Sequence, residues 1–321
     1  MNNDKVELKN RMHGSLMGGV VGDALGSPFE FKYRDSYVAS GEMVYNDMFD
    51  LPAGSFTDDS SMMLCLAKSL TENQGFNPTD QIEKYFDWMT KGYMSSSPKE
   101  GCFDIGRTTS DALHEYYRRK RESPDMDHIA YCGSTANNAS GNGGIMRLAP
   151  IPVMYWRNEA SAAEAARLSS AVTHGSSQCL ESADLMARII IRLLRGLPKS
   201  EATAVDPTLY ECSSVQRLAR GDYIGKPRDD IYTSGYVIHS LEAALWAFEK
   251  YDNFEEGMVV LLNMGNDVDT VCCIYGQIAG ASYGADAIPK RWIDALQMKE
   301  MVTSIMVDLE DLALEDWVMT S

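Results

Sequence analysis

The stretch Gly265-Asn266-Asp267-Val268-Asp269-Thr270 places a glycine, two carboxylates and a hydroxyl directly before the apolar run 271–281. The pattern predicts a polar first turn on an otherwise buried helix. Asp and Thr are ordinary helix N-caps, and acidic side chains are favourable near the positive end of the helix dipole. Crowded carboxylates are costly to bury unless a cation lies among them, and such oxygens suit Mg²⁺, Mn²⁺ or Ca²⁺ rather than zinc.

A second stretch, Phe56-Thr57-Asp58-Asp59-Ser60-Ser61, repeats this design far earlier in the chain. Thr57 is well placed as an N-cap, and the helix that follows presents one apolar face. That face consists of Met62, Met63, Leu66 and Leu70. Two oxygen-rich helix starts that are distant in sequence can close on one pair of metal ions.

The composition excludes several classes of partner. A formal net charge of −17 over 321 residues argues against a nucleic-acid or anionic membrane surface, because binding to phosphate backbones requires clustered Lys and Arg. The seven cysteines are never spaced as Cys-x-x-Cys, so neither a disulfide framework nor a zinc site is expected. With no signal-peptide core and no membrane-length apolar run, we expect a soluble protein of the cytoplasm.

Apolar residues recur at helical spacing along the chain, and no stretch alternates as a strand does, so the predicted fold is nearly all α. No low-complexity linker divides the sequence. Repeated glycines in the first helix indicate close packing against another helix. Residues 198–233 are rich in charge and are expected to form a surface insertion. Helices are expected over 8–26, from 57 onwards, over 78–94, 109–121, 161–171, 177–194, 241–248, from 269 onwards, from the segment 287–292 onwards and over 301–317.

Two further carboxylates stand near helix ends. Glu30 lies on a loop just past Pro28, from which it can reach a site or remain solvated. Asp104 lies between glycines before a new helix, where it can point into a cleft or only form a turn. The residues alone leave both alternatives open.

Three other features can contact a ligand. The run Ser140-Gly141-Asn142-Gly143-Gly144 can turn backbone amides inward as a nest that holds phosphate oxygens without lysine. His174 stands at a helix junction, and Tyr236 stands beside a glycine. Either side chain can bind a ligand or simply pack in the core.

In their order along the chain, these segments resemble the ADP-ribosylglycohydrolase family, which includes the dinitrogenase reductase-activating glycohydrolase and the ADP-ribosyl-arginine hydrolases. The matching segments cover nearly the whole sequence. They are Gly22-Asp23-Ala24-Leu25-Gly26 with Glu30, Thr57-Asp58-Asp59-Ser60, Phe103-Asp104-Ile105-Gly106, Ser140-Gly141-Asn142-Gly143 with Met146-Arg147, Thr173-His174, Gly235-Tyr236-Val237, Gly265 through Thr270, and Ile288-Pro289 with Trp292.

The resemblance implies a compact all-α single domain over residues 1–321, with a central cleft that holds two Mg²⁺ or Mn²⁺ ions. It assigns Asp269 as the bridge between the ions. The other implied ligands are Thr57, Asp58 and Asp59 for one ion, and Asp267 and Thr270 for the second. The residues implied to hold phosphates and ribose or to face the adenosine are Ser140, Gly141, Asn142, Gly143, Gly144, His174 and Tyr236.

Glu30 matches the family's mobile glutamate near the metals, and Asp104 matches the aspartate that arginine-directed members place beside the scissile ribose. Either can be the general base, and the sequence does not decide between them. Departures from the family pattern are mild, because Asn266, Val268 and Ser60 replace commoner residues without removing a ligand oxygen.

The implied activity is hydrolysis of the N-glycosidic bond between ADP-ribose and a protein side chain, most directly arginine. Expected partners are therefore an ADP-ribosylated protein and ADP-ribose. Cleavage of a ribosyl bond passes through an oxocarbenium-like state that nearby carboxylates stabilise while a base activates water. Open alternatives are a serine, O-acetyl-ADP-ribose or nucleic-acid linkage, a non-catalytic relative that binds ADP-ribose or only packs, and a metal-dependent phosphoesterase.

Overall fold

The structure is a computed structural model that describes residues 2–97, 101–123 and 130–315. Within these ranges the chain forms fourteen α-helices, and its only β-pairing consists of three isolated bridges. The predicted all-α fold is confirmed. The helices are α1 Asn2–Gly26, α2 Asp58–Asn73, α3 Pro78–Lys91, α4 Arg107–Glu122, α5 Pro150–Met154, α6 Glu159–Ala171, α7 Ser177–Leu194, α8 Lys199–Ala202, α9 Ser213–Ala219, α10 Val237–Lys250, α11 Phe254–Leu262, α12 Val268–Tyr283, α13 Lys290–Ala295 and α14 Lys299–Leu314.

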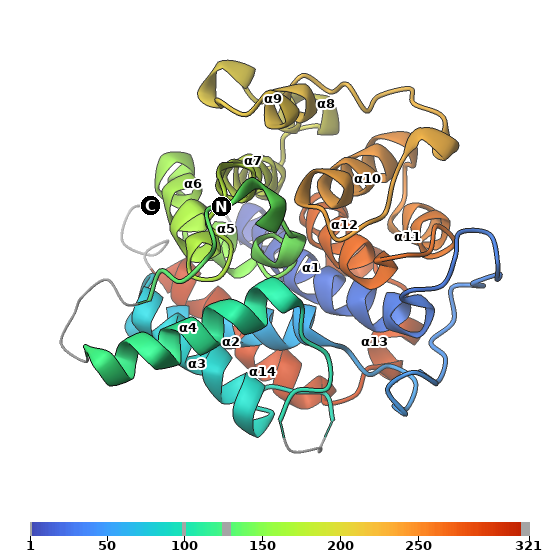
Figure 1. The fold of residues 1–321 in the computed structure, drawn as a ribbon. Coiled ribbons are helices and arrows are strands. Elements are labelled where there is room, and N and C mark those ends of the chain that lie inside the picture. Colours follow the sequence, from blue (N-terminus) through green and yellow to red (C-terminus); the bar gives the residue numbers. More distant parts are fainter. Residues whose placement is uncertain (1, 98–100, 124–129, 316–321) are drawn as a thin grey trace.

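Helices α1 and α12 lie against each other at the centre of the molecule, with other helices around them (Figure 1). Glycines allow their backbones to touch. A Cβ atom added at Gly18 would lie 2.3 Å from the carbonyl oxygen of Gly276, and one added at Gly22 would lie 2.1 Å from that of Cys272. The expectation that glycines in the first helix mark close helix packing is therefore confirmed.

The contact between α1 and α12 continues to the end of α1. There, a Cβ atom at Gly26 would lie 2.3 Å from the Cα atom of Asp269. Because the helices run in opposite directions, the C-terminal end of α1 meets the first turn of α12. This packing brings Asp23 and the loop that carries Glu30 beside Asp269.

Asp23 of α1 also fixes the start of α2. Its carboxylate accepts hydrogen bonds from the backbone amides of Thr57 and Ser60, both at 3.0 Å, and from the Thr57 hydroxyl at 2.8 Å. Thr57 occupies the N-cap position, as predicted, but its own side chain makes no capping hydrogen bond. The amides at the start of α2 are therefore satisfied by a side chain from another helix.

Segment 198–233 corrects the sequence-based expectation of a surface insertion. It contains only the short helices α8 and α9 and single 3-10 turns, but its apolar side chains belong to the main core. Tyr210 and Tyr223, for example, are 3% and 1% exposed. The abundant charges of the segment lie on its outer face. They dominate its composition, so the apolar residues of its inner face were not recognised from the sequence.

Other helix boundaries moved by a few residues. Helix α3 ends at Lys91 rather than Met94, because Gly92 adopts a left-handed conformation with φ of 72°. The first helix begins at Asn2, earlier than expected, and the expected end of the last helix near Trp317 lies outside the described residues. No helix in the described part of the chain is long and apolar enough to cross a membrane.

Candidate active site

A cleft of about 410 Å³ is lined by the first turns of α2, α4 and α12 and by the glycine-rich turn Asn142–Gly144. Its floor is acidic, since Glu30, Asp58, Asp104, Asp267 and Asp269 all contribute to the lining. The N-termini of three helices therefore face one acidic space.

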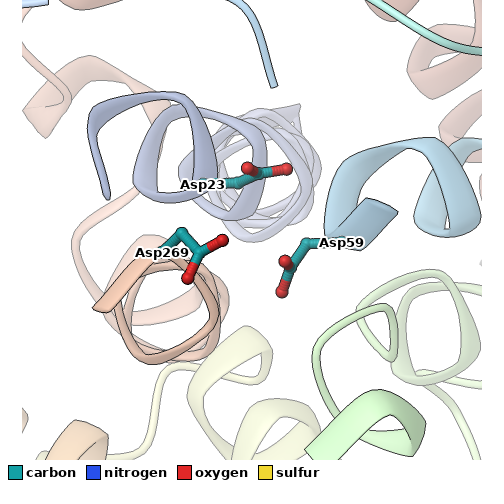
Figure 2. A group of neighbouring side chains, drawn as sticks. All are labelled: Asp23, Asp59 and Asp269. Carbon is teal, nitrogen blue, oxygen red and sulfur yellow. The ribbon is translucent and has the colours of Figure 1, made fainter. Parts of the chain in front are cut away.

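Two groups of carboxylates adjoin in this region. Asp23, Asp59 and Asp269 come from α1, α2 and α12 and gather around one space (Figure 2), with one oxygen of each within 4.8 Å of the others. Glu30, Asp104 and Asp269 form a second group of the same kind. Asp269 belongs to both groups, so its carboxylate lies between them.

Several oxygens in these groups have no partner. Oδ1 of Asp59, Oδ1 of Asp269 and Oε2 of Glu30 are buried and accept no hydrogen bond from any described residue. The neighbouring charges that act most strongly on these three side chains are all carboxylates. Buried oxygens without a donor cost free energy unless a cation or a proton satisfies them.

The electrostatics of the cleft lead to the same conclusion. Burial and the neighbouring carboxylates raise the pKa of Asp58, Asp59 and Asp269 well above the ordinary aspartate value. Burial, followed by the charges of Asp104 and Asp267, raises the pKa of Glu30 to about 10. Burial, followed by the charges of Asp23 and Asp267, raises the pKa of Asp104 to about 7. Ionised carboxylates this close together require a compensating positive charge, and an all-oxygen donor set fits Mg²⁺ or Mn²⁺.

The structure brings the two predicted acidic helix starts together. Asp58, Asp267 and Thr270 line the cleft with Asp269. The other two expected ligands, Thr57 and Asp59, are buried and do not line it. The Thr57 and Thr270 hydroxyls each lie 3.4 Å from Oδ2 of Asp59, so the start of α2 meets that of α12 at Asp59.

Asp23 was not predicted as a site residue, although it lies in a segment that resembles the family. Burial raises its pKa, which hydrogen bonds from Ser60 and Thr57 partly oppose. Because its oxygens already accept these bonds, its main role here is to hold α2 in place. The signal that could have revealed it is a single aspartate among the apolar residues and glycines of a buried helix.

The predicted phosphate-binding run contributes only part of its length. Gly141, Asn142 and Gly143 line the cleft, whereas Ser140 and Gly144 do not. The Ser140 hydroxyl is 2.8 Å from both the Asn137 carbonyl oxygen and the Ser176 hydroxyl. A Cβ atom at Gly144 would lie 2.3 Å from the Ser170 hydroxyl, so this glycine serves packing.

Only some backbone amides of this run are free to bind a phosphate as a nest. The amide of Gly141 donates to the Ala139 carbonyl oxygen at 2.9 Å, and that of Asn142 donates to the Gly235 carbonyl oxygen at 3.1 Å. These two amides are therefore used within the protein. The Asn142 side chain donates to Asp267 at 2.5 Å and thereby links this wall to the acidic floor.

The remaining predicted substrate residues differ in position. His174 lines the cleft and is 3% exposed. Tyr236 does not line it, and its ring packs edge-on against the His239 ring at 5.0 Å. The cleft wall also includes Phe31, Arg107, Thr108 and Thr109, which sequence reasoning missed. The only indication in the sequence that these residues belong to the site was their position directly after Glu30 or after the segment that contains Asp104.

The ADP-ribosylglycohydrolase family model matches residues 4–318. This chain belongs to the ADP-ribosylglycohydrolase family. It is accordingly a glycosylhydrolase, as the sequence predicted, and the match covers slightly more of the chain than the segments that first indicated it.

Members of the family that resemble this chain include enzymes acting on modified arginine. ADP-ribosylarginine hydrolase Tri1 of Serratia proteamaculans is 34% identical over 311 residues, covering 97% of this chain and 81% of the relative. Tri1 of Pseudomonas putida is 32% identical over 305 residues, covering 95% and 79%. A solved structure described as an ADP-ribosylglycohydrolase-related protein complex superposes with a TM-score of 0.81 at 34% identity, covering 96% of this chain and 99% of that chain.

Proposed function

We propose that this enzyme removes ADP-ribose from arginine side chains of modified proteins and depends on two Mg²⁺ or Mn²⁺ ions. The observation that carries the metal requirement is the pair of adjoining carboxylate groups with unpartnered buried oxygens. The preference for arginine is supported by the two Tri1 relatives, which are named as ADP-ribosylarginine hydrolases. We further propose that residues 1–321 act as one domain, because α1 and α12 come from opposite ends of the chain.

The groups that would hold the ions are those at the starts of α2 and α12. They would be Asp58, Asp267, Asp269 and Thr270, which line the cleft, together with the buried Thr57 and Asp59, and Asp269 would serve both ions. Bound ions of this type supply Lewis-acid stabilisation and lower the pKa of a coordinated water. The carboxylates around them stabilise the positive charge that develops on the ribose ring as its bond to the leaving group breaks.

We assign the general base to Asp104. Its side chain lines the cleft and is only partly buried, whereas Glu30 is 6% exposed and has one oxygen buried without a partner. In the proposed step Asp104 accepts a proton from water as the water oxygen bonds to the anomeric carbon and the bond from that carbon to the guanidine nitrogen breaks. Asp104 then passes the proton to the departing nitrogen. The products are free ADP-ribose and unmodified arginine. Gly143 and His174 would contact the phosphate or ribose portion.

The assignment of Asp104 predicts the effect of Asp104→Asn. We expect kcat for hydrolysis of ADP-ribosyl-arginine to fall by about 10²- to 10³-fold, because general-base catalysis contributes on that order. Mn²⁺ affinity, measured by titration calorimetry, should change much less than kcat. Glu30→Gln is the matched comparison, and a larger loss of kcat in Glu30→Gln than in Asp104→Asn would reverse the assignment.

The overall proposal is tested by a substrate panel. Arginine-, serine- and nucleic-acid-linked ADP-ribose and O-acetyl-ADP-ribose are each incubated with Mg²⁺, with Mn²⁺ and with EDTA, and released ADP-ribose is measured. We expect the arginine linkage to be cleaved fastest and EDTA to abolish cleavage. Equal rates with EDTA would contradict the metal requirement. Release of AMP from ADP-ribose would instead favour a phosphoesterase.

A further inference from the structure

Arg147 is a buried cation, and none of the carboxylates of the cleft forms an ion pair with it. It follows the glycine-rich turn, is 0% exposed, and forms no ion pair with any described residue. Its guanidinium lies over the Tyr85 ring at 4.6 Å and donates from Nη2 to the Thr173 hydroxyl at 2.6 Å. Burial of an unpaired charge is unfavourable, so its retention here requires an explanation.

The hydrogen bond from Arg147 determines to which partner the Thr173 hydroxyl can donate its proton. An arginine guanidinium only donates, so the Thr173 oxygen is the acceptor in that bond. Among the described residues, the other partner of the Thr173 hydroxyl is Nδ1 of His174, at 2.8 Å. The hydroxyl proton is satisfied only if Thr173 donates it to Nδ1. The ring proton of His174 then lies on Nε2.

The imidazole is held where Nε2 can meet a ligand. His174 lines the cleft, and its ring packs over Gly143, where a Cβ atom would lie 2.5 Å from Cε1. The backbone of His174 is fixed by its amide donating to Ser170 at 2.7 Å and by the Ser170 hydroxyl donating back at 3.0 Å. Nε2 makes no hydrogen bond to the described part of the chain.

The state of the ring agrees with this arrangement. Burial, followed by the nearby charge of Arg147, lowers the pKa of His174 to about 3. The imidazole is therefore neutral near pH 7 and carries one ring proton. With Nδ1 occupied by Thr173, the only ring donor left for a ligand is Nε2.

We propose that Arg147 and Thr173 are positioning residues that hold His174 with Nε2–H directed at an anionic oxygen of the ligand. Resting on the proposed function, that oxygen belongs to a phosphate of ADP-ribose. The order of donation is Arg147 to Thr173, Thr173 to His174, and His174 to phosphate. The charge of Arg147 lies behind this chain of hydrogen bonds and adds a positive potential, so a strongly acidic protein can hold a phosphate at this wall.

The proposal is tested with Thr173→Val, which keeps the side-chain shape but removes the hydroxyl, and with Thr173→Ser as the matched control. Nitrogen NMR of labelled histidine in the ligand-free protein should show an unprotonated Nδ1 and a protonated Nε2 for His174 in the wild type and in Thr173→Ser. The chain has five histidines, and His174→Gln identifies the relevant signal. Thr173→Val should lose this signature.

Binding provides the second measurement. We expect Thr173→Val to weaken ADP-ribose binding about tenfold, as loss of one well-placed hydrogen bond does, while Thr173→Ser retains wild-type affinity. KM should rise more than kcat falls. A proton on Nδ1 in the wild type, or wild-type affinity in Thr173→Val, would overturn the proposal.

These outcomes are separate from the test of the proposed function. The NMR signature is read on the ligand-free protein, and ADP-ribose binding needs no cleavage. A wild-type enzyme that shows the signature and binds ADP-ribose but leaves arginine linkages intact would refute the proposed function alone.

Discussion

Replacement of Asp269 by asparagine is expected to lower kcat for hydrolysis of ADP-ribosyl-arginine by about 10³-fold. Asp269 lies between the two acidic helix starts and is proposed to serve both ions, so its loss removes a ligand from each proposed ion site. Metal ions supply several kcal/mol of transition-state stabilisation, and each 1.36 kcal/mol corresponds to about a tenfold change in rate. Steady-state kinetics at saturating Mg²⁺ and calorimetric titration with Mn²⁺ measure the two effects.

Controls separate this loss from unfolding. Asp308→Asn removes an exposed carboxylate on α14 and should retain wild-type kinetics. In EDTA, Asp269→Asn should melt at or above the wild-type temperature, because one buried negative charge has been removed from a repulsive group. Undiminished activity in Asp269→Asn would refute the bridging role.

The second large effect is expected from Gly22→Ala. The new Cβ atom would lie 2.1 Å from the carbonyl oxygen of Cys272 and 2.9 Å from the amide nitrogen of Cys273. Both are backbone atoms, so the side chain cannot be accommodated by a rotamer change and α1 must move away from α12. Overpacking of this kind costs roughly 3 kcal/mol or more, which outweighs the gain of about 1 kcal/mol from replacing a helical glycine by alanine.

Thermal unfolding measures this prediction, with a Tm lowered by roughly 5–10 °C. Gly106→Ala is the matched control, since no atom lies within 4 Å of a Cβ built there and its φ of −63° suits alanine. The Tm of Gly106→Ala should stay close to that of the wild type. A Gly22→Ala protein as stable as the wild type would show that the α1–α12 contact can relax.

The periodic parts of the sequence predicted the helices well. Helix α7 begins and ends at the expected residues, and the acidic starts of α2 and α12 were recognised because charged groups directly before apolar helices are unusual. The partner of the first helix was not predicted, although Gly276 and Gly280 repeat the four-residue spacing of Gly18 and Gly22. Spacing shows that a helix packs closely but does not identify its neighbour.

The parts that were missed depend on contacts between distant residues. The capping of α2 by Asp23 joins two helices, and no local rule assigns an N-cap to a side chain from elsewhere in the chain. The glycine-rich run was expected to offer its amides to phosphate, but the Asn142 amide is bound by the carbonyl oxygen of Gly235, far away in sequence. Tertiary hydrogen bonds of this kind cannot be read from residue types alone.

The central pairing of α1 with α12 also affects how the protein is made. During synthesis the N-terminal helix leaves the ribosome long before its partner exists, and contacts between distant segments slow folding. Until residue 283 has emerged, the glycine face of α1 has no helix to pack against, and nothing holds Asp23 beside Asp269. Nascent chains of this enzyme should therefore depend on chaperones until α12 has been made, and catalytic competence should appear only once residue 283 has left the ribosome.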